Sequence, residues 1–315
     1  MMNSLNRKFI ILYRYHKDFD LVLQRIKLIK LIDPEIRLFG IFGGEYSKFK
    51  EAEDYFSDYF ENNYLIKVED GKWKWLHADI TYQMWYNDVG KGIDFDFVAV
   101  MEWDLLYMEK IENLFPNIKE NEIHVSGLIP LKKISKCWFW ANSENYKKYL
   151  VFKGQVEKLH HKVPSEYAIL GPGLCMPKSF LNDLSRIKLV DAYITDELKI
   201  PIWSQLLGYN LVSNNFYRNW FSFFEQKYFN ANTINIDLKT IEKQLLKNNG
   251  RRAFHPFREK IESQTLYSKY SSALKRNGNT INNKRYKVKT ICRYFYSLHC
   301  KMTALIYGKN AKLSY

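Results

Sequence analysis

Several features that would define common protein classes are missing from this 315-residue sequence. It has no apolar run near the roughly 18 residues that a membrane-spanning helix needs, and its N-terminus lacks the pattern of a secretory signal, so we expect a cytoplasmic protein. The four cysteines form no CxxC pair, which fits free thiols in a reducing compartment. The absence of GxGxxG and GxxxxGK[ST] argues against a Rossmann dinucleotide enzyme and a P-loop NTPase.

Positive charge is concentrated near the C-terminus. Residues 251–315 contain 15 Lys or Arg and 2 Asp or Glu, whereas the first 250 residues contain 33 basic and 32 acidic residues. This distribution predicts a nearly neutral catalytic or binding body, residues 1–260, and a basic, helical C-terminal extension, residues 261–315. The apolar positions of residues 291–306 recur every three or four residues, so this helix could lie on an anionic membrane surface or pack on the body.

Strand-like and helix-like segments alternate through the first half of the chain. Strands are expected at 9–13, 36–42, 64–68, 95–101 and 124–130, and helices at 18–32, 47–61 and 73–88. The third helix has Trp75, Ile80, Met84 and Trp85 as core candidates. Residues 131–165 have few clear periods and are interpreted as a lid or an acceptor-facing region. The alternation predicts an α/β fold with a mostly parallel, twisted sheet flanked by helices.

The strand-like run of residues 95–101 is followed by two acids, Glu102 and Asp104. In an extended backbone these two side chains point to the same side, and Trp103 points to the other. Two carboxylates at the carboxyl end of a buried strand could hold Mg²⁺ or Mn²⁺ and, through it, a diphosphate. The alternative is that both acids are simply solvated at the end of a strand.

Three further segments carry candidate site residues. Asp196 and Glu197 precede a helix-like segment, where either acid could be a general base, or Thr195 or Asp196 could cap the helix. The apolar segment 168–176 contains Gly171 and Gly173, which permit either close approach to a ligand or a tight turn before a helix. His255 could bind a metal or a phosphate, although a single His in a loop more often does neither.

The order of these segments resembles the nucleotide-sugar glycosyltransferases of the GT-A fold, over residues 8–258. Glu102-Trp103-Asp104 is similar to the Asp-x-Asp motif of that family, and Gly171-Pro172-Gly173 is similar to its glycine-rich acceptor-side segment. Thr195-Asp196-Glu197 resembles the acidic motif that supplies the base in inverting members, and Phe254-His255-Pro256 resembles a late His-Pro element. Glu replaces Asp at the first motif position, and the base could be either acid of the Asp-Glu pair.

The resemblance implies an inverting, metal-assisted transfer of a sugar from a nucleotide-sugar, expected to be a UDP-sugar, to a hydroxyl of a glycan or lipid-linked acceptor. Asp104, Glu102 through water, and His255 would hold Mn²⁺ or Mg²⁺. Tyr13 and Arg14 would lie near the nucleotide, and Arg251 and Arg252 would assist the diphosphate. Such an enzyme would suit polysaccharide biosynthesis on the inner face of a membrane.

Other classes of function remain open on the sequence. A non-catalytic carbohydrate-binding protein on the same fold would leave the acids inactive, and hydrolysis of a nucleotide-sugar without transfer is a third possibility. A nucleic-acid-binding protein would use the basic extension. The nearly neutral body with acids at strand ends argues against that last class.

Overall fold

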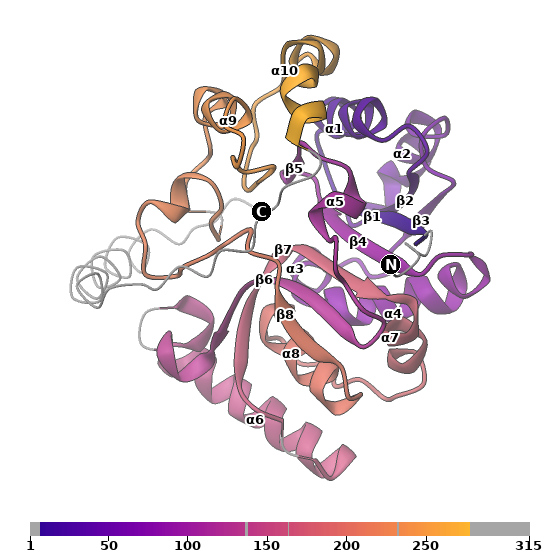
Figure 1. Cartoon of the computed structure of the whole chain (residues 1–315). Coiled ribbons are helices and arrows are strands. Elements are labelled where there is room, and N and C mark those ends of the chain that lie inside the picture. Colours follow the sequence, from indigo (N-terminus) through magenta and orange to yellow (C-terminus); the bar gives the residue numbers. More distant parts are fainter. Residues whose placement is uncertain (1–6, 136–137, 163, 232, 278–315) are drawn as a thin grey trace, which may run out of the picture.

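A central sheet organises the computed structural model, which describes residues 7–135, 138–162, 164–231 and 233–277 (Figure 1). The sheet has seven strands in the order β3-β2-β1-β4-β7-β6-β8. Their bounds are β1 (Phe9–Tyr15), β2 (Arg37–Phe42), β3 (Asn62–Leu65), β4 (Phe97–Glu102), β6 (Glu122–Pro130), β7 (Tyr167–Pro177) and β8 (Asn210–Ser213). Only β7, among these strands, runs antiparallel to its neighbours, β4 and β6. The expected α/β fold with a mostly parallel sheet is therefore confirmed.

The two central strands are almost entirely apolar, because helices cover both faces of the sheet. In β1 and β4, Leu12 pairs with Val100 and Arg14 pairs with Glu102. This register places a cation beside an acid at the carboxyl ends of both strands. Figure 1 shows α1 (Phe19–Ile32) and α2 (Phe49–Tyr55) on one side of the sheet and α4 (Ala78–Asp88) on the other.

The remaining helices complete the two layers and the ends of the molecule. Those after α2 and before β6 are α3 (Gly71–Leu76), α4 and α5 (Ile111–Leu114); those after β6 are α6 (Ser143–His160), α7 (Lys178–Leu184), α8 (Asp196–Leu206), α9 (Leu238–Leu245) and α10 (Ser263–Asn277). On one face of the sheet, α4 packs against both α7 and α8. A second small sheet pairs β5 (Leu106–Tyr107) with β9 (Ala253–Phe254).

The expected helix over residues 73–88 is two helices, α3 and α4, which meet at His77 in a non-helical conformation. Trp73 and Trp85 are buried, but Trp75 is 45% exposed, so its assignment to the core was wrong. Trp73 faces the core, and a residue two positions further along a helix points to nearly the opposite side. Trp75 therefore faces solvent.

Two segments of the second half form regular elements that the sequence pattern did not predict. Residues 143–160 form α6, with Tyr149, Phe152 and Val156 buried at helical spacing. The segment of Gly171 and Gly173 is neither loop nor turn: it forms the long strand β7, whose apolar residues are buried. A strand covered on both faces shows a continuous apolar run, without the alternation that marks a half-exposed strand.

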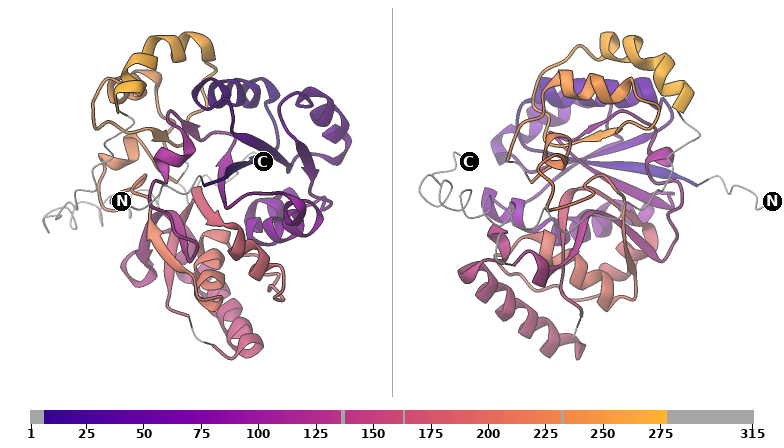
Figure 2. Two further views of the ribbon diagram at one scale, coloured as in Figure 1. Left: turned by 45° about the vertical axis from the view of Figure 1, so that its right-hand side comes forward. Right: turned by 60° about the vertical axis from the view of Figure 1, so that its left-hand side comes forward.

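The start of the C-terminal extension packs on the body. Ile261, Leu266 and Tyr270 are buried in a cluster with Leu28 of α1 and Phe257. Figures 1 and 2 show α10 beside α1, in agreement with the contacts between these helices. The division at residue 260 stays a prediction, and the apolar positions at residues 291–306 lie outside the described residues. Among the helices of the described part, none is long and apolar enough to cross a membrane.

Candidate active site

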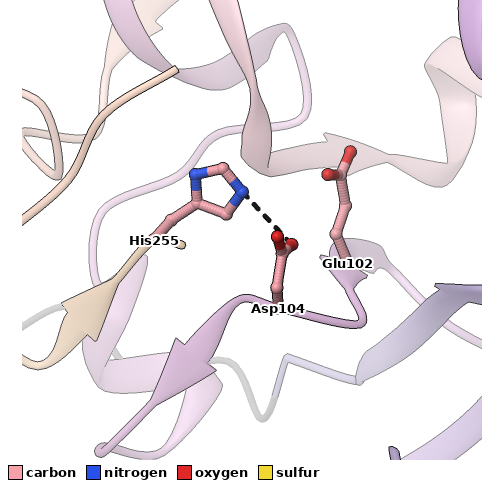
Figure 3. Close-up of side chains that lie close together, drawn as sticks. All are labelled: Glu102, Asp104 and His255. Atoms are coloured by element: carbon pink, nitrogen blue, oxygen red, sulfur yellow. Dashed lines mark ion pairs between the residues drawn. The ribbon is translucent and has the colours of Figure 1, made fainter. Parts of the chain in front are cut away.

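Three potential metal ligands meet at the carboxyl end of β4. Ligand atoms of Glu102, Asp104 and His255 all lie within 4.8 Å of one another (Figure 3). Glu102 ends β4 and Asp104 lies in the following turn. His255 arrives from the distant C-terminal segment because β9 pairs with β5, and Phe257 N donates a hydrogen bond of 2.8 Å to Asp104 O.

The hydrogen bonds of His255 suit a metal ligand. Its Nδ1 lies 2.8 Å from the backbone oxygen of Asn230, an acceptor, so Nδ1 carries the proton in this contact. That arrangement leaves Nε2, which lies 3.3 Å from Asp104 Oδ1, available as a ligand. Metal-binding histidines are commonly oriented by such a second hydrogen bond. Two carboxylates and an oriented imidazole therefore fit a divalent cation, and the imidazole favours Mn²⁺ over Mg²⁺, which prefers oxygen ligands.

The pKa values of the three side chains are shifted by burial and by neighbouring charges. Burial would raise the pKa of Asp104, but His255 and Arg258 more than offset it and hold this pKa below its usual value. Arg258 contacts Asp104 Oδ2 at 3.0 Å. Burial would lower the pKa of His255, but Asp104 raises it. For Glu102, burial raises the pKa although Arg14 acts against it.

Arg14 connects the group of Glu102, Asp104 and His255, here called the metal-type group, to Asp196 of α8. Its Nη1 atom lies 3.3 Å from Glu102 Oε1, 3.8 Å from Asp196 Oδ2 and 3.4 Å from the hydroxyl of Tyr82. The β1–β4 register explains the first contact, and the position of α8 explains the second. The sequence-based expectation placed Arg14 near a nucleotide; in the structure its guanidinium contacts two acids of the protein.

Asp196 and Glu197 occupy the first turn of α8, which Thr195 caps by accepting a hydrogen bond from Glu197 N. The capping role considered for Thr195 is thus present, and the acids remain available for other contacts. Glu197 Oε1 accepts a 2.8 Å hydrogen bond from Gly171 N of β7. Burial raises the pKa of Asp196 to about 6 despite the nearby Arg14, and it raises the pKa of Glu197 well above its usual value.

Gly171 of β7 lies close to both Glu102 and Glu197. A side-chain carbon added at this position would lie 3.7 Å from both Glu102 Oε1 and Glu197 Oε1. The strand β7 therefore passes close to both acids, and its backbone N–H is one of their partners. The tight turn is not formed, and the approach observed is to two acids of the protein; the approach of Gly171 to a ligand stays a prediction.

The remaining candidate residues, Arg251, Arg252 and Tyr13, have other surroundings. Arg251 contacts both carboxylate oxygens of Glu225 at 2.6 Å, and Arg252 donates to the backbone oxygens of Gln244 and Lys247 near the end of α9. Tyr13 is fully buried; burial raises its pKa, and the Asp104 carboxylate adds to this effect. The donor-binding roles of these three residues stay predictions.

Two side chains of the site were missed by sequence reasoning. Arg258 contacts Asp104 and lies over the ring of Trp103, with 5.5 Å between its guanidinium carbon and the ring centroid. Arg258 follows the His255-Pro256 element by two residues, and this position could have indicated that it lies near the proposed metal ligands. Tyr82 of α4, which contacts Arg14, had no signal in the sequence beyond a helical apolar face.

Comparisons with known proteins give matches among solved structures alone. Neither a family model nor a curated protein matches the sequence. The structure is similar to the bifunctional glycosyltransferase WbbM, with 8% identity and a TM-score of 0.38 over 88% of this chain and 53% of WbbM. It is also similar to the galactosyltransferase LgtC in complex with donor and acceptor sugar analogs, with 13% identity and a TM-score of 0.37 over 65% of this chain and 72% of LgtC.

A third similar structure is the mannosyltransferase PcManGT from Pyrobaculum calidifontis in complex with GDP-Man and Mn²⁺. The identity is 8% and the TM-score 0.36, over 67% of this chain and 55% of that protein. This chain spans about half the length of WbbM. All three proteins are described as glycosyltransferases, the class that the sequence resembles. Because these TM-scores lie below 0.5, the functional proposal rests on the residues of this chain.

Proposed function

We propose that this protein is a metal-assisted glycosyltransferase that moves a sugar from a nucleotide-sugar to an acceptor hydroxyl. The observation that carries the proposal is the arrangement at the carboxyl ends of β1 and β4. There, a metal-type group of Glu102, Asp104 and His255 lies next to the acids of α8, and Arg14 contacts both groups. In open α/β sheets this edge is the usual place for a ligand.

The donor side of the proposed site combines ligands for a cation with basic side chains. Asp104 and His255, with Glu102, would hold Mn²⁺, which would offset the negative charge that develops on a diphosphate leaving group. Arg258 and Lys17 lie over the ring of Trp103, at 5.5 Å and 5.4 Å from its centroid. Cations held in this way are suited to binding phosphate oxygens. A UDP-sugar remains the expected donor.

The acceptor side requires a base. Asp196 is the better candidate of the two acids, because a carboxylate whose pKa is raised to about 6 is still ionised at neutral pH and is more basic than an ordinary Asp. Asp196 would take the proton of the acceptor hydroxyl as that oxygen attacks the anomeric carbon. The inverting outcome follows from direct attack on that carbon. Glu197, held by Gly171 N, would orient the acceptor.

Calorimetric titration with UDP, with and without Mn²⁺, tests the donor site directly. We expect UDP to bind tightly only in the presence of the cation, and a panel of nucleotide-sugars to include one that is turned over. Asp104→Ala should lose both activities, while Asp58→Ala, at an exposed acid elsewhere, should keep them. Metal-independent UDP binding, or an Asp104→Ala variant with normal turnover, would contradict the proposal.

A lipid-linked acceptor and a peripheral place on the inner face of a membrane are part of the same proposal. They depend on the basic residues beyond position 277, which the structure does not describe. Sedimentation of the full-length protein with anionic and with neutral vesicles would test them, and equal sedimentation with both would reject an electrostatic attachment.

A further inference from the structure

Three aromatic side chains, two exposed and one half-buried, form a platform at the edge of the sheet where the parallel strands end. The platform consists of Trp75 of α3 with Phe139 and Trp140 of the short helix η4 (Phe139–Ala141). The ring centroids of Trp75 and Trp140 are 5.2 Å apart, and those of Phe139 and Trp140 are 4.9 Å apart. These neighbouring rings are tilted by 57° and 75°, so the platform presents separate ring faces. Phe139 is 61% exposed and Trp75 is 45% exposed. Large aromatic faces are thus open to solvent.

The topology places this platform near the proposed site. The segment with α3 follows β3, and the segment with η4 follows β6. β3 runs parallel to β4 through the parallel pairs β3–β2, β2–β1 and β1–β4. β6 also runs parallel to β4, because both strands are antiparallel to β7. The platform therefore joins segments from the two halves of the sheet at the edge where Glu102 ends β4. Lys74 of α3 also donates a 2.7 Å hydrogen bond to Gly44 O, just beyond the end of β2.

Two hydrogen bonds fasten α3 to the loop that leads into the catalytic acids. Trp73 Nε1 donates to Asp191 Oδ1 at 3.1 Å, and the Tyr193 hydroxyl donates to Asp70 Oδ2 at 2.7 Å. Asp70 is itself the N-cap of α3, and the loop continues directly to Asp196. The helix that carries Trp75 is therefore attached to the segment that carries the proposed base.

We propose that the platform of Trp75, Phe139 and Trp140 is an acceptor subsite that stacks on a sugar ring of a saccharide acceptor; this inference rests on the proposed function. Aromatic faces bury the apolar C–H face of a pyranose and leave its hydroxyl edge free for polar groups. Exposed side chains of both signs surround the platform, with Glu69 before α3, Lys72 in α3, and Lys132 and Lys133 before η4. Such side chains can accept hydrogen bonds from sugar hydroxyls and donate hydrogen bonds to them.

The test compares four single variants of the full-length protein. Trp75→Ala and Phe139→Ala remove platform faces, and Trp75→Phe keeps an aromatic face. Phe224→Ala is the matched control, because Phe224 is 72% exposed and lies on a different loop. Circular dichroism confirms that each variant is folded. The assays are donor hydrolysis, transfer to methyl glycosides and short oligosaccharides, and saturation-transfer NMR with the same saccharides.

We expect both alanine variants to lower transfer at least about tenfold relative to donor hydrolysis, which corresponds to about 1.4 kcal/mol of lost acceptor binding. They should also lose the saturation transfer to sugar-ring protons, and Trp75→Phe and Phe224→Ala should keep both. Unchanged transfer in the alanine variants would overturn the inference. So would an equal loss of hydrolysis and transfer, since the platform would then contact the donor or support the fold.

Two further outcomes separate this inference from the proposed function. If the wild-type protein turns over no nucleotide-sugar, the proposed function fails, and the NMR assay still decides whether the platform binds saccharides. If no saccharide gives a signal that depends on Trp75, the subsite is refuted even when donor hydrolysis is intact. Sedimentation with anionic vesicles that is lost in Trp75→Ala would assign the platform to a membrane and overturn the saccharide assignment.

Discussion

Replacing Arg14 by Met should move the acid limb of the pH–rate profile to higher pH. Asp196 must be ionised to act as a base, so activity is expected to fall below its pKa of about 6. Arg14 stabilises the ionised form from 3.8 Å, and so does Lys199; Glu102 and Asp79 oppose it. Without the guanidinium, the repulsion from the two acids is less balanced, and the pKa of Asp196 rises further.

The size of this displacement follows from the distance. Two unit charges about 4 Å apart attract with about 1 kcal/mol in bulk water and about 4 kcal/mol near a protein surface. These energies correspond to pKa changes of about 0.7 and about 3. The Asp196 side chain is only 9% exposed, which favours the upper part of the range, but Arg14 also serves Glu102. We therefore expect a displacement of about 1 to 2 pH units.

The assay is the pH dependence of kcat/KM for sugar transfer, which reports the ionisation of the free enzyme. Arg14→Lys keeps a positive charge and should retain a near-normal acid limb. Arg37→Met serves as the control, because Arg37 forms an exposed ion pair with Glu61. An acid limb that stays near pH 6 in Arg14→Met, or that moves equally in Arg14→Lys, would refute the role of Arg14.

Three other changes have distinct expected results. His255→Gln should weaken Mn²⁺ binding by calorimetry more than Mg²⁺ binding, because it exchanges an imidazole for an oxygen ligand; equal losses would count against His255 as a ligand. Asp196→Asn should lower turnover about 10²-fold or more. It should also raise the free energy of unfolding at pH 7.5 by about 3 kcal/mol, because the fold raises the pKa of Asp196 from 3.8 to about 6 and the ionised acid therefore destabilises the folded state. This gain should shrink as the pH falls through 6 and vanish below about pH 3 in urea titrations, where the wild-type acid is protonated in both states. A gain that persists there would have another origin. Truncation after Lys260 removes the buried Leu266 and Tyr270, each worth about 1.5–3 kcal/mol, so the resulting protein should melt at a lower temperature than the protein truncated after Asn277, which keeps α10. Equal melting temperatures of the two truncated proteins would show that α10 adds no stability.

Local patterns of the sequence were sufficient for several elements in the first half of the fold. β1 and β4 were recognisable as uninterrupted apolar runs, and α1 by its periodic apolar positions. The proximity of Glu102 and Asp104 was predicted from an extended chain, but β4 ends at Glu102 and the local turn that follows it places Asp104. In each of these cases, the residues that decide the structure are neighbours in the sequence.

The second half depended on contacts between distant segments. The apolar segment 168–176 contains Gly171, Pro172 and Gly173, which are typical of a turn, yet it forms the strand β7 between β4 and β6. The break at His77 depends on tertiary packing in the same way, since the sequence on either side has helical periodicity. Tertiary context overrides local propensity at both places.

The position of Arg14 shows most clearly why the site could not be completed from the sequence. Its contacts require the lateral order of β1 and β4, the register that pairs Arg14 with Glu102, and the approach of α8. Burial raises the pKa of Glu102, Asp196 and Glu197, so the fold disfavours the ionised forms of three neighbouring acids. Arg14 supplies one positive charge to two of these acids. A divalent cation held by Glu102, Asp104 and His255 would add positive charge beside these acids and would favour their ionised forms further.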